Sequence, residues 1–312
     1  MEELLTTRRA FMLASFAKMS LWVIRITLLV AWALPVNIVQ ISQWELSILT
    51  ICGGALFGVG ATVNGGCAFF TLTRLGSGDL GMVASLAGFL IGAGAHGISV
   101  ATVLVPAPVE RIAPSLVDGP WFLPITVVTT LWMAWELVRL MRSTSNKNLR
   151  HRLLSHSYRL STAALLMGVS NAVLYALAGV WPYTRLFGEI ARHAAIGTPP
   201  PQVIFWLLFG ALIIGIGLSA WQRREIVLQW RPRPNWVGYG VGGMLMGFGA
   251  AMIPGGNDVL ILQGIPSLSP HAIPTFLAML GGIAVSLLSM RALGMTIPQV
   301  DCSGDICGVE PK

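Results

Sequence analysis

The sequence predicts an all-α polytopic membrane protein with eight to nine transmembrane helices and an inverted-topology repeat, in which broken or re-entrant helices meet at the repeat interface. Three observations lead to this fold class. The 312 residues are 54% hydrophobic and only 11% charged, whereas a soluble domain has about 25% charged residues. Apolar stretches long enough to cross a bilayer recur along the chain. Two of these stretches share one glycine pattern.

The apolar stretches define the transmembrane helices, because about 20 apolar residues cross a bilayer as a helix. Eight stretches meet this requirement, near residues 12–34, 46–64, 80–105, 121–141, 160–181, 203–221, 236–254 and 271–290. The third is long and rich in glycine, so a bend or an extra short helix there gives the upper count of nine. The N-terminus lacks the basic segment and cleavage site of a secretory signal, so we expect the first helix to be retained.

We expect a single transmembrane domain over residues 1–290 and a cytoplasmic tail over residues 291–312. Within the domain, repeat one covers about 12–105, bridging helices cover about 121–181, and repeat two covers about 203–290.

The basic residues predict the orientation in the membrane. Six lysines and arginines lie between Arg139 and Arg159, and four arginines lie between Arg223 and Arg233. The segments 106–120 and 182–202 contain only three arginines together. Because cytoplasmic loops are enriched in Lys and Arg, the two basic loops are predicted inside, with both termini cytoplasmic, in a multi-pass protein of the bacterial cell inner membrane.

The net charge of +7 has the same origin. Basic loops that interact with lipid head groups explain it, so we expect the lipid bilayer and no nucleic acid as partner. Binding of a soluble partner by the loop from Arg139 to Arg159 is the alternative interpretation of that loop.

An internal repeat links two apolar segments. The stretch "GALFGVGATVNGGCAFF" starts at Gly54, and "GMLMGFGAAMIPGGNDV" starts at Gly243. With a shift of 189 residues they agree at Gly54 and Gly243, Gly58 and Gly247, Gly60 and Gly249, Ala61 and Ala250, and Gly66 and Gly255. The matching stretches belong to the second and the seventh predicted spans. This offset of five spans is an odd number, so the copies run in opposite directions. The alternative is a chance match in a chain with 35 glycines.

Adjacent glycines interrupt the helical pattern in both copies. Gly65 and Gly66 allow the backbone to leave helical geometry, and non-helical backbone at membrane depth must be buried in protein or face a water-filled cavity. Inverted repeats commonly place the substrate at such breaks. Close helix packing through small residues is the alternative, and it fits Gly88, Gly92 and Gly94 better than the glycine pair.

The motif "GxGAxxxGGC", which ends at Cys67, the following "RLGSGDLG" and the second motif "GFGAAMIPGGND" resemble the YeeE/YedE family of sulfur-transport proteins. The resemblance covers both repeats. It implies an hourglass-like fold with short helices at the waist, and uptake of thiosulfate or a similar anion that receives hydrogen bonds from thiols. Gly256 stands where a second thiol would match, and no cysteine lies between Cys67 and Cys302. A relay of several thiols therefore does not carry over.

The polar and glycine residues around the two breaks are the candidate substrate-binding and permeation residues. They are Asn64, Gly65, Gly66, Cys67, Arg74, Gly255, Gly256, Asn257 and Asp258. For Cys67, packing as a small hydrophobic residue is the alternative to contact with substrate. The amides of Asn64 and Asn257 are expected to donate to an oxyanion.

Charged residues near the breaks allow several interpretations. Arg74 attracts the anion or extends to the lipid head groups. Asp258 pairs with a cation, caps a short helix or takes up a proton. Asp79 is expected to cap the helix that follows it. His96 forms a local hydrogen bond or belongs to a proton relay.

The tail contains two cysteines in "DCSGDIC", Cys302 and Cys307. Without a second ligand pair they are a weak zinc signal. They hand sulfur to a soluble cytoplasmic sulfur-carrier protein, or they belong to a disordered, reactive tail.

These features together predict a transporter or permease for a small inorganic sulfur anion of the thiosulfate type. We expect no enzyme, no cofactor and no bound metal, because the sequence shows no nucleotide-binding loop, metal-ligand cluster or nucleophile–base pair. One alternative is a membrane-bound sulfur-relay or sulfur-processing protein that uses Cys67 and the tail cysteines. Another is a membrane scaffold with degenerate motifs.

Overall fold

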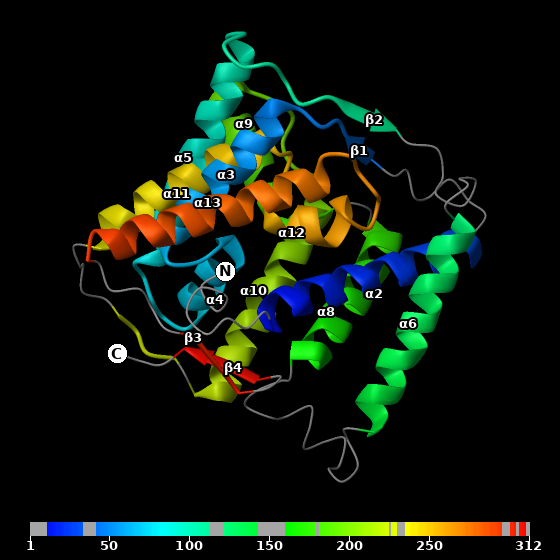
Figure 1. The fold of residues 1–312 in the computed structure, drawn as a ribbon. Coiled ribbons are helices and arrows are strands. Elements are labelled where there is room, and N and C mark those ends of the chain that lie inside the picture. The colour runs from blue at the N-terminus through cyan, green and yellow to red at the C-terminus, as the bar shows by residue number, and fades with distance from the viewer. Residues whose placement is uncertain are drawn as a thin grey trace.

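Helices dominate the protein. The computed structural model describes residues 11–33, 42–112, 122–142, 160–178, 181–224, 226–229, 235–294, 300–303 and 306–309. Each of the eight apolar stretches contains a helix, as predicted (Figure 1). These are α2 (Phe11–Ala33), α3 (Ile48–Asn64), α5 (Met82–Ala101), α6 (Phe122–Arg142), α8 (Leu160–Ala178), α10 (Val203–Arg223), α11 (Asn235–Met252) and α13 (Ala272–Ala292). The shorter helices are α4 (Ala68–Gly76), α9 (Tyr183–Ile196), α12 (Asn257–Val259) and the π-helix η2 (Leu260–Gly264).

Several of these helices have the length and composition of membrane spans. Within the described ranges, five helical segments qualify, or six if α11 and the short helices after it form one bent span. The five are Ile48–Gly76, Met82–Ala101, Leu123–Arg142, Val203–Arg223 and Ala272–Ala292. The apolar part of α8 is shorter, Leu160–Leu174. The protein is therefore a helical membrane protein, and the count of eight to nine spans stays a prediction.

The helical fold class is confirmed, and two short antiparallel ribbons in the connecting and terminal segments accompany the helices. Strand β1 (Ser42–Trp44) pairs with β2 (Glu110–Ile112), and β3 (Val300–Ser303) pairs with β4 (Ile306–Val309). Extended connecting segments satisfy their backbone N–H and C=O groups by pairing with one another, and the apolar pattern contains no signal for these short ladders.

Connections that are predicted on one side of the membrane contact one another. Gln43 Nε2 donates to the carbonyl of Ser267 over 2.6 Å, and β1, which contains Gln43, pairs with β2 of a third connection at the same end. At the opposite end, Val227 N donates to the carbonyl of Ser77 over 3.0 Å. Connections predicted on one side thus lie at one end of the structure, and which end faces the cytoplasm stays a prediction.

Two helices that correspond in the repeat, α3 and α11, cross in opposite directions. A Cβ on Gly53 would lie 3.0 Å from the carbonyl oxygen of Gly249, and a Cβ on Gly60 would lie 2.7 Å from that of Gly242. The residue numbers of the contacts increase along α3 while they decrease along α11. The two helices are therefore antiparallel neighbours.

Each of these helices also runs parallel to a helix of the other copy, α5 beside α11 and α13 beside α3. The contacts that fix these directions are Gly88 with Gly240, Gly92 with Met244, Gly54 with Thr275, and Gly58 with Met279. In Figure 1, α3, α5, α11 and α13 form one layered group, and α2, α6 and α8 lie together beside it.

Glycine is required at these contacts because the backbones touch. A Cβ on Gly58 would lie 2.2 Å from the carbonyl oxygen of Met279, and one on Gly247 would lie 2.0 Å from that of Phe89. Both distances are well inside van der Waals contact. Small residues of this kind let membrane helices approach closely and gain packing energy.

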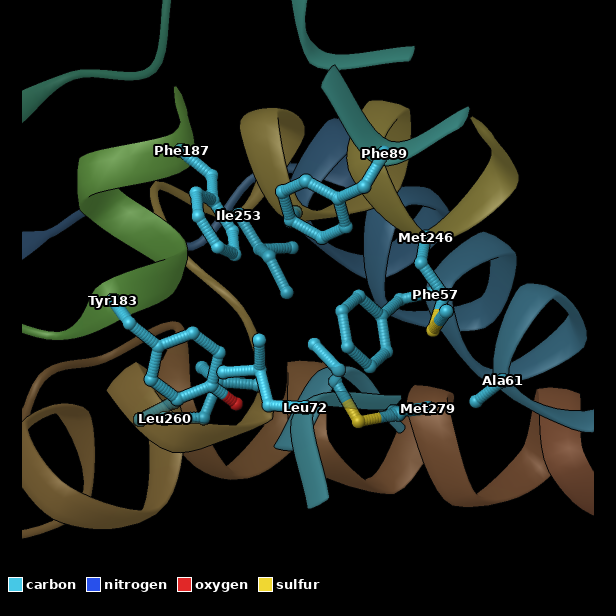
Figure 2. Close-up of a cluster of buried hydrophobic side chains, with 13 residues drawn as sticks. Phe57, Ala61, Leu72, Phe89, Tyr183, Phe187, Met246, Ile253, Leu260 and Met279 are labelled. Atoms are coloured by element: carbon cyan, nitrogen blue, oxygen red, sulfur yellow. The ribbon is translucent and has the colours of Figure 1, made fainter. Parts of the chain in front are cut away.

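A cluster of apolar side chains fills the space between this group of helices and the short helices. Figure 2 shows Phe57 of α3, Leu72 of α4, Tyr183 of α9 and Leu260 of η2 directed toward one another. Phe57 and Leu260 are completely buried. The two breaks described next border this cluster.

Candidate substrate-binding site at two helix breaks

The first break separates α3 from α4. Gly65 follows the last residue of α3 with φ of +78°, and Gly66 N donates to the carbonyl of Ala61 over 2.8 Å. This is a left-handed helix end, which favours glycine. A Cβ on Gly66 would lie 2.1 Å from the ring of Phe70. The glycine pair therefore ends one helix and lets the next begin at once.

The second break has the same construction between α11 and α12. Gly255 N donates to the carbonyl of Ala250 over 2.7 Å, and Gly255 has φ of +140°. A Cβ on Gly255 would lie 2.1 Å from the side chain of Val259. The helix axis bends by 43° across this break. Both helices are thus interrupted at the predicted glycine pairs, with matching contacts 189 residues apart.

Cys67 lies close to the second break. It is the N-cap residue of α4 and is half-buried against the apolar cluster. Its thiol forms no side-chain capping hydrogen bond, and the backbone of Phe69 and Phe70 and the side chain of Asn257 are near it. The first residue after one break therefore has a polar side chain of the other break as a neighbour.

Asp258 is held by a residue of α9. Thr184 Oγ1 donates to Asp258 Oδ1 over 2.7 Å and accepts from Gly256 N over 3.1 Å. Asp258 Oδ2 is buried and has no hydrogen-bond partner in the described part of the chain. No cation pairs with Asp258 among these residues, and Gly256 is the N-cap of α12, without a side-chain cap. Asp258 belongs to the first turn of α12, so its carboxylate lies beside the start of that short helix.

Asn64 fixes the first break from within. Its side chain is fully buried, and its Nδ2 donates to the carbonyl of Gly66 over 3.0 Å and to Thr71 Oγ1 over 2.8 Å. Both amide hydrogens are engaged, so Asn64 holds the turn and has no further N–H to offer an oxyanion. Asn257 differs from Asn64, because its side chain is near the sulfur of Cys67 and its Oδ1 is buried without a partner in the described ranges.

Arg74 joins α4 to α5 and α11. Its guanidinium pairs with Asp79 and lies over the rings of Tyr239 and Phe70, 5.3 and 5.7 Å from their centroids. Asp79 also accepts from Gly81 N over 3.1 Å, in the turn before α5, whose N-cap is Gly81 and not the predicted Asp79. Arg74 belongs to the last turn of α4, and its guanidinium extends back towards the first break, where a Cβ on Gly65 would lie 3.9 Å from its Nη1.

A small cavity of about 140 Å³ lies at the end of α11 that precedes the second break. Met252, His96 and Glu45 line it, together with residues 106–109. The His96 ring makes an edge contact with Phe248, with centroids 5.4 Å apart. Within the described ranges, no group of three His, Cys, Asp or Glu side chains could hold a metal ion.

Sequence reasoning missed helix α9 and with it Thr184 and Tyr183. The segment 182–202 was assigned to an outer connection because it contains few basic residues. Its signal was a proline followed by an amphipathic pattern, which is typical of a 14-residue helix too short to span a bilayer.

The fold defines a helical membrane protein in which two helices are interrupted at glycine pairs. The chain belongs to the family described as Sulphur transport, which matches residues 1–285. It is similar to the thiosulfate transporter TsuA of Spirochaeta thermophila, with 25% identity over 260 residues that cover 75% of each chain. It is also similar to the thiosulfate transporter TsuA of Escherichia coli, with 23% identity over 241 residues that cover 68% of this chain and 66% of that one.

Proposed function

We propose that this protein is an inner-membrane transporter or permease, and no enzyme, for a small sulfur-containing anion of the thiosulfate type. The observation that supports this most directly is the position of Cys67, between the amides at the start of α4 and the Asn257 side chain of the other copy. Membership of the sulfur-transport family and the names of its two relatives support the substrate class.

In this proposal the anion passes between the two breaks. Helix starts have unpaired N–H groups and a partial positive charge, so the first turn of α4 replaces part of the water that the anion loses. The thiol of Cys67 and the amide of Asn257 complete the contact from the two copies. A thiol is a weak donor, which holds the anion without trapping it. The chain offers one thiol here, so transfer along several thiols is not part of the mechanism.

Asp258 suggests how transport is driven. A carboxylate so close to Cys67 would repel an anion, unless it is protonated while the anion is bound. Its Oδ2 is buried without a partner in the described part, and Thr184 holds the other oxygen over 2.7 Å. We infer that Asp258 takes up a proton together with the anion, which would couple uptake to a proton gradient.

We further propose that the two copies form an inverted-topology repeat with both termini in the cytoplasm. The antiparallel crossing of α3 and α11 supports opposite directions for the copies. The equivalent contacts at the two breaks, Gly66 with Phe70 and Gly255 with Val259, support the 189-residue correspondence. Contacts between connections on the same predicted side support the orientation.

The runner-up is a sulfur-relay protein that passes sulfur to a soluble cytoplasmic carrier through its tail. One observation favours it, because Cys302 and Cys307 are directly opposite each other in the β3–β4 ribbon. Uptake of labelled thiosulfate into liposomes that contain the purified protein tests the two proposals. Net uptake without a soluble carrier supports the transporter, and uptake that requires a carrier and both tail cysteines supports the relay.

A further inference from the structure

Arg25 is a charged residue in the middle of α2 and has no role in the mechanism proposed above. Arg25 lies between the apolar residues Ile24 and Ile26 and is only partly exposed. Its Nε is buried and has no hydrogen-bond partner, and no ion pair reaches it within the described residues. A charge at membrane depth is costly, and where it is kept it usually marks a pathway or a binding site.

The contacts of α2 show which way Arg25 faces. Lys18 Nζ forms an ion pair with Glu136 of α6 over 3.0 Å, and the Trp22 ring makes an edge contact with Trp132 of α6, with centroids 5.5 Å apart. Arg25 follows Lys18 by seven residues, which is a rotation of only about 20° on a helix. Arg25 therefore projects from the same face of α2, toward α6.

The same face also contacts α8. Lys18 Nζ donates to Ser161 Oγ over 2.7 Å, and a Cβ on Gly168 would lie 2.6 Å from the Cβ of Trp22. Continuing both contacts by one turn brings Arg25 to the level of Thr129 on α6 and Asn171 on α8. Polar residues thus share its level at the interface of α2 with α6 and α8, which lie together in Figure 1.

The acidic groups at this helix interface do not neutralise Arg25. Helices α2 and α8 contain no acidic residue, and the only one in α6 is Glu136. Glu136 is fully buried and already pairs with Lys18 and, over 3.2 Å, with Arg139. Arg25 lies about 10 Å further along the helix axis. Three cations and one carboxylate leave this interface with an excess of positive charge.

This helix interface is next to the second break. Ser20 of α2 donates to the carbonyl of Ile261 over 2.8 Å, and Asn171 of α8 donates to that of Leu262 over 3.3 Å. Both carbonyls belong to η2, which directly follows α12. The position that matches Arg25 in the second copy is Ile214, which is 64% exposed. The arginine is therefore present in α2 and absent from α10, where the matching position is an exposed isoleucine.

We propose that Arg25 binds a small sulfur oxyanion at the interface of α2 with α6 and α8, as a second binding site outside the two breaks. This inference rests on the proposed function, because it assigns a second binding site to the anion that the protein is proposed to transport. A planar guanidinium suits two oxygens of a tetrahedral anion. Arg25 is eight residues from the end of α2 at Ala33, about 12 Å along the axis, so a free anion reaches it more easily than a lipid phosphate.

The test uses the full chain in liposomes, either of neutral lipid alone or with an anionic phospholipid, and measures thiosulfate uptake. Arg25→Gln is compared with Arg185→Gln, which removes an arginine from a surface pair with Glu189. Loss of a charged hydrogen bond should raise the KM of Arg25→Gln roughly ten- to a hundredfold, with little change in the maximal rate. Arg185→Gln should match the parent, and the result should be the same in both lipids.

Three results would overturn the inference. The first is a parental KM for Arg25→Gln. The second is a KM effect confined to liposomes with anionic lipid, which would make lipid phosphate the ligand. The third is an equal KM effect for Arg185→Gln.

If Arg25→Gln does not fold, Arg25→Lys is the deciding variant, because it keeps the charge and loses the planar guanidinium. A raised KM for Arg25→Lys supports the site, and a parental KM refutes it. If the parent transports no thiosulfate, the proposed function fails. The rise in melting temperature with added thiosulfate then tests the site alone, since Arg25→Gln should lose that rise and an unchanged rise refutes the site.

Discussion

Replacement of Cys67 by alanine tests the crossing of the two breaks. The substitution removes a sulfur that faces two backbone amides and the Asn257 side chain. Cys67 is half-buried and forms no regular capping hydrogen bond, so we expect helix α4 and the fold to persist. One hydrogen bond of ordinary strength contributes about 0.5–1.5 kcal/mol, which corresponds to a roughly two- to twelvefold rise in KM for thiosulfate.

The assay is uptake of labelled thiosulfate into liposomes, with the melting temperature as the measure of folding. Cys52→Ala is the matched control, because Cys52 belongs to the same apolar segment and is exposed. Cys67→Ser keeps a donor and loses the sulfur. It should transport nearly as well as the parent if Cys67 only binds, and almost not at all if Cys67 forms a covalent sulfur intermediate. If Cys67→Ala and Cys67→Ser both keep the KM and rate of Cys52→Ala, the thiol only fills space and our site is wrong.

Further predictions address packing, coupling, orientation and the tail. Gly247→Ala should lower stability by about 1–3 kcal/mol in thermal unfolding, since its Cβ would meet the Phe89 carbonyl, whereas Gly215→Ala, with nothing within 4 Å, should be neutral. Thr184→Val removes the donor to Asp258 Oδ1, so the pH dependence of uptake should shift while folding persists; an unchanged profile argues against proton coupling. Cysteines placed at position 146 should be labelled only from the cytoplasm and those at 115 and 195 only from outside, and labelling of 146 from outside would contradict the orientation. Removal of the residues after Pro298 should leave thiosulfate binding intact, and loss of folding would show that the tail packs against the domain.

The sequence was sufficient for the helices and for the two breaks, because both depend on local patterns. An apolar stretch of about 20 residues has few alternatives to a helix in a bilayer. The adjacent glycines permit the left-handed turn that Gly65 adopts, with φ of +78°. The breaks are therefore readable without knowledge of what surrounds them.

Interactions between distant helices were not predictable in the same way. Arg74 and Asp79 were interpreted separately, as a binding residue and a helix cap, yet the turn between α4 and α5 brings them together as an ion pair. Thr184 contacts Asp258 across 74 positions of the chain. Such contacts depend on how helices cross, and a single sequence has no local signal for a crossing. The same reason explains why the pairing of Lys18 with Glu136 was missed.

The two copies share a backbone and differ in chemistry, which has a consequence for transport. With the 189-residue shift, Cys67 corresponds to Gly256, and Asn257 and Asp258 correspond to Ala68 and Phe69. One copy therefore contributes the thiol and the other the amide and the carboxyl group. Because neither segment has the complete set, we expect one substrate site between the two breaks, as proposed above, and not two equal sites. If this is the site of passage, exchanging the side chains at 67 and 256 should preserve the fold but separate the thiol from Asn257, and uptake should then fall as it does in Cys67→Ala. Full uptake by the exchanged protein would show that the backbone breaks alone are sufficient for passage.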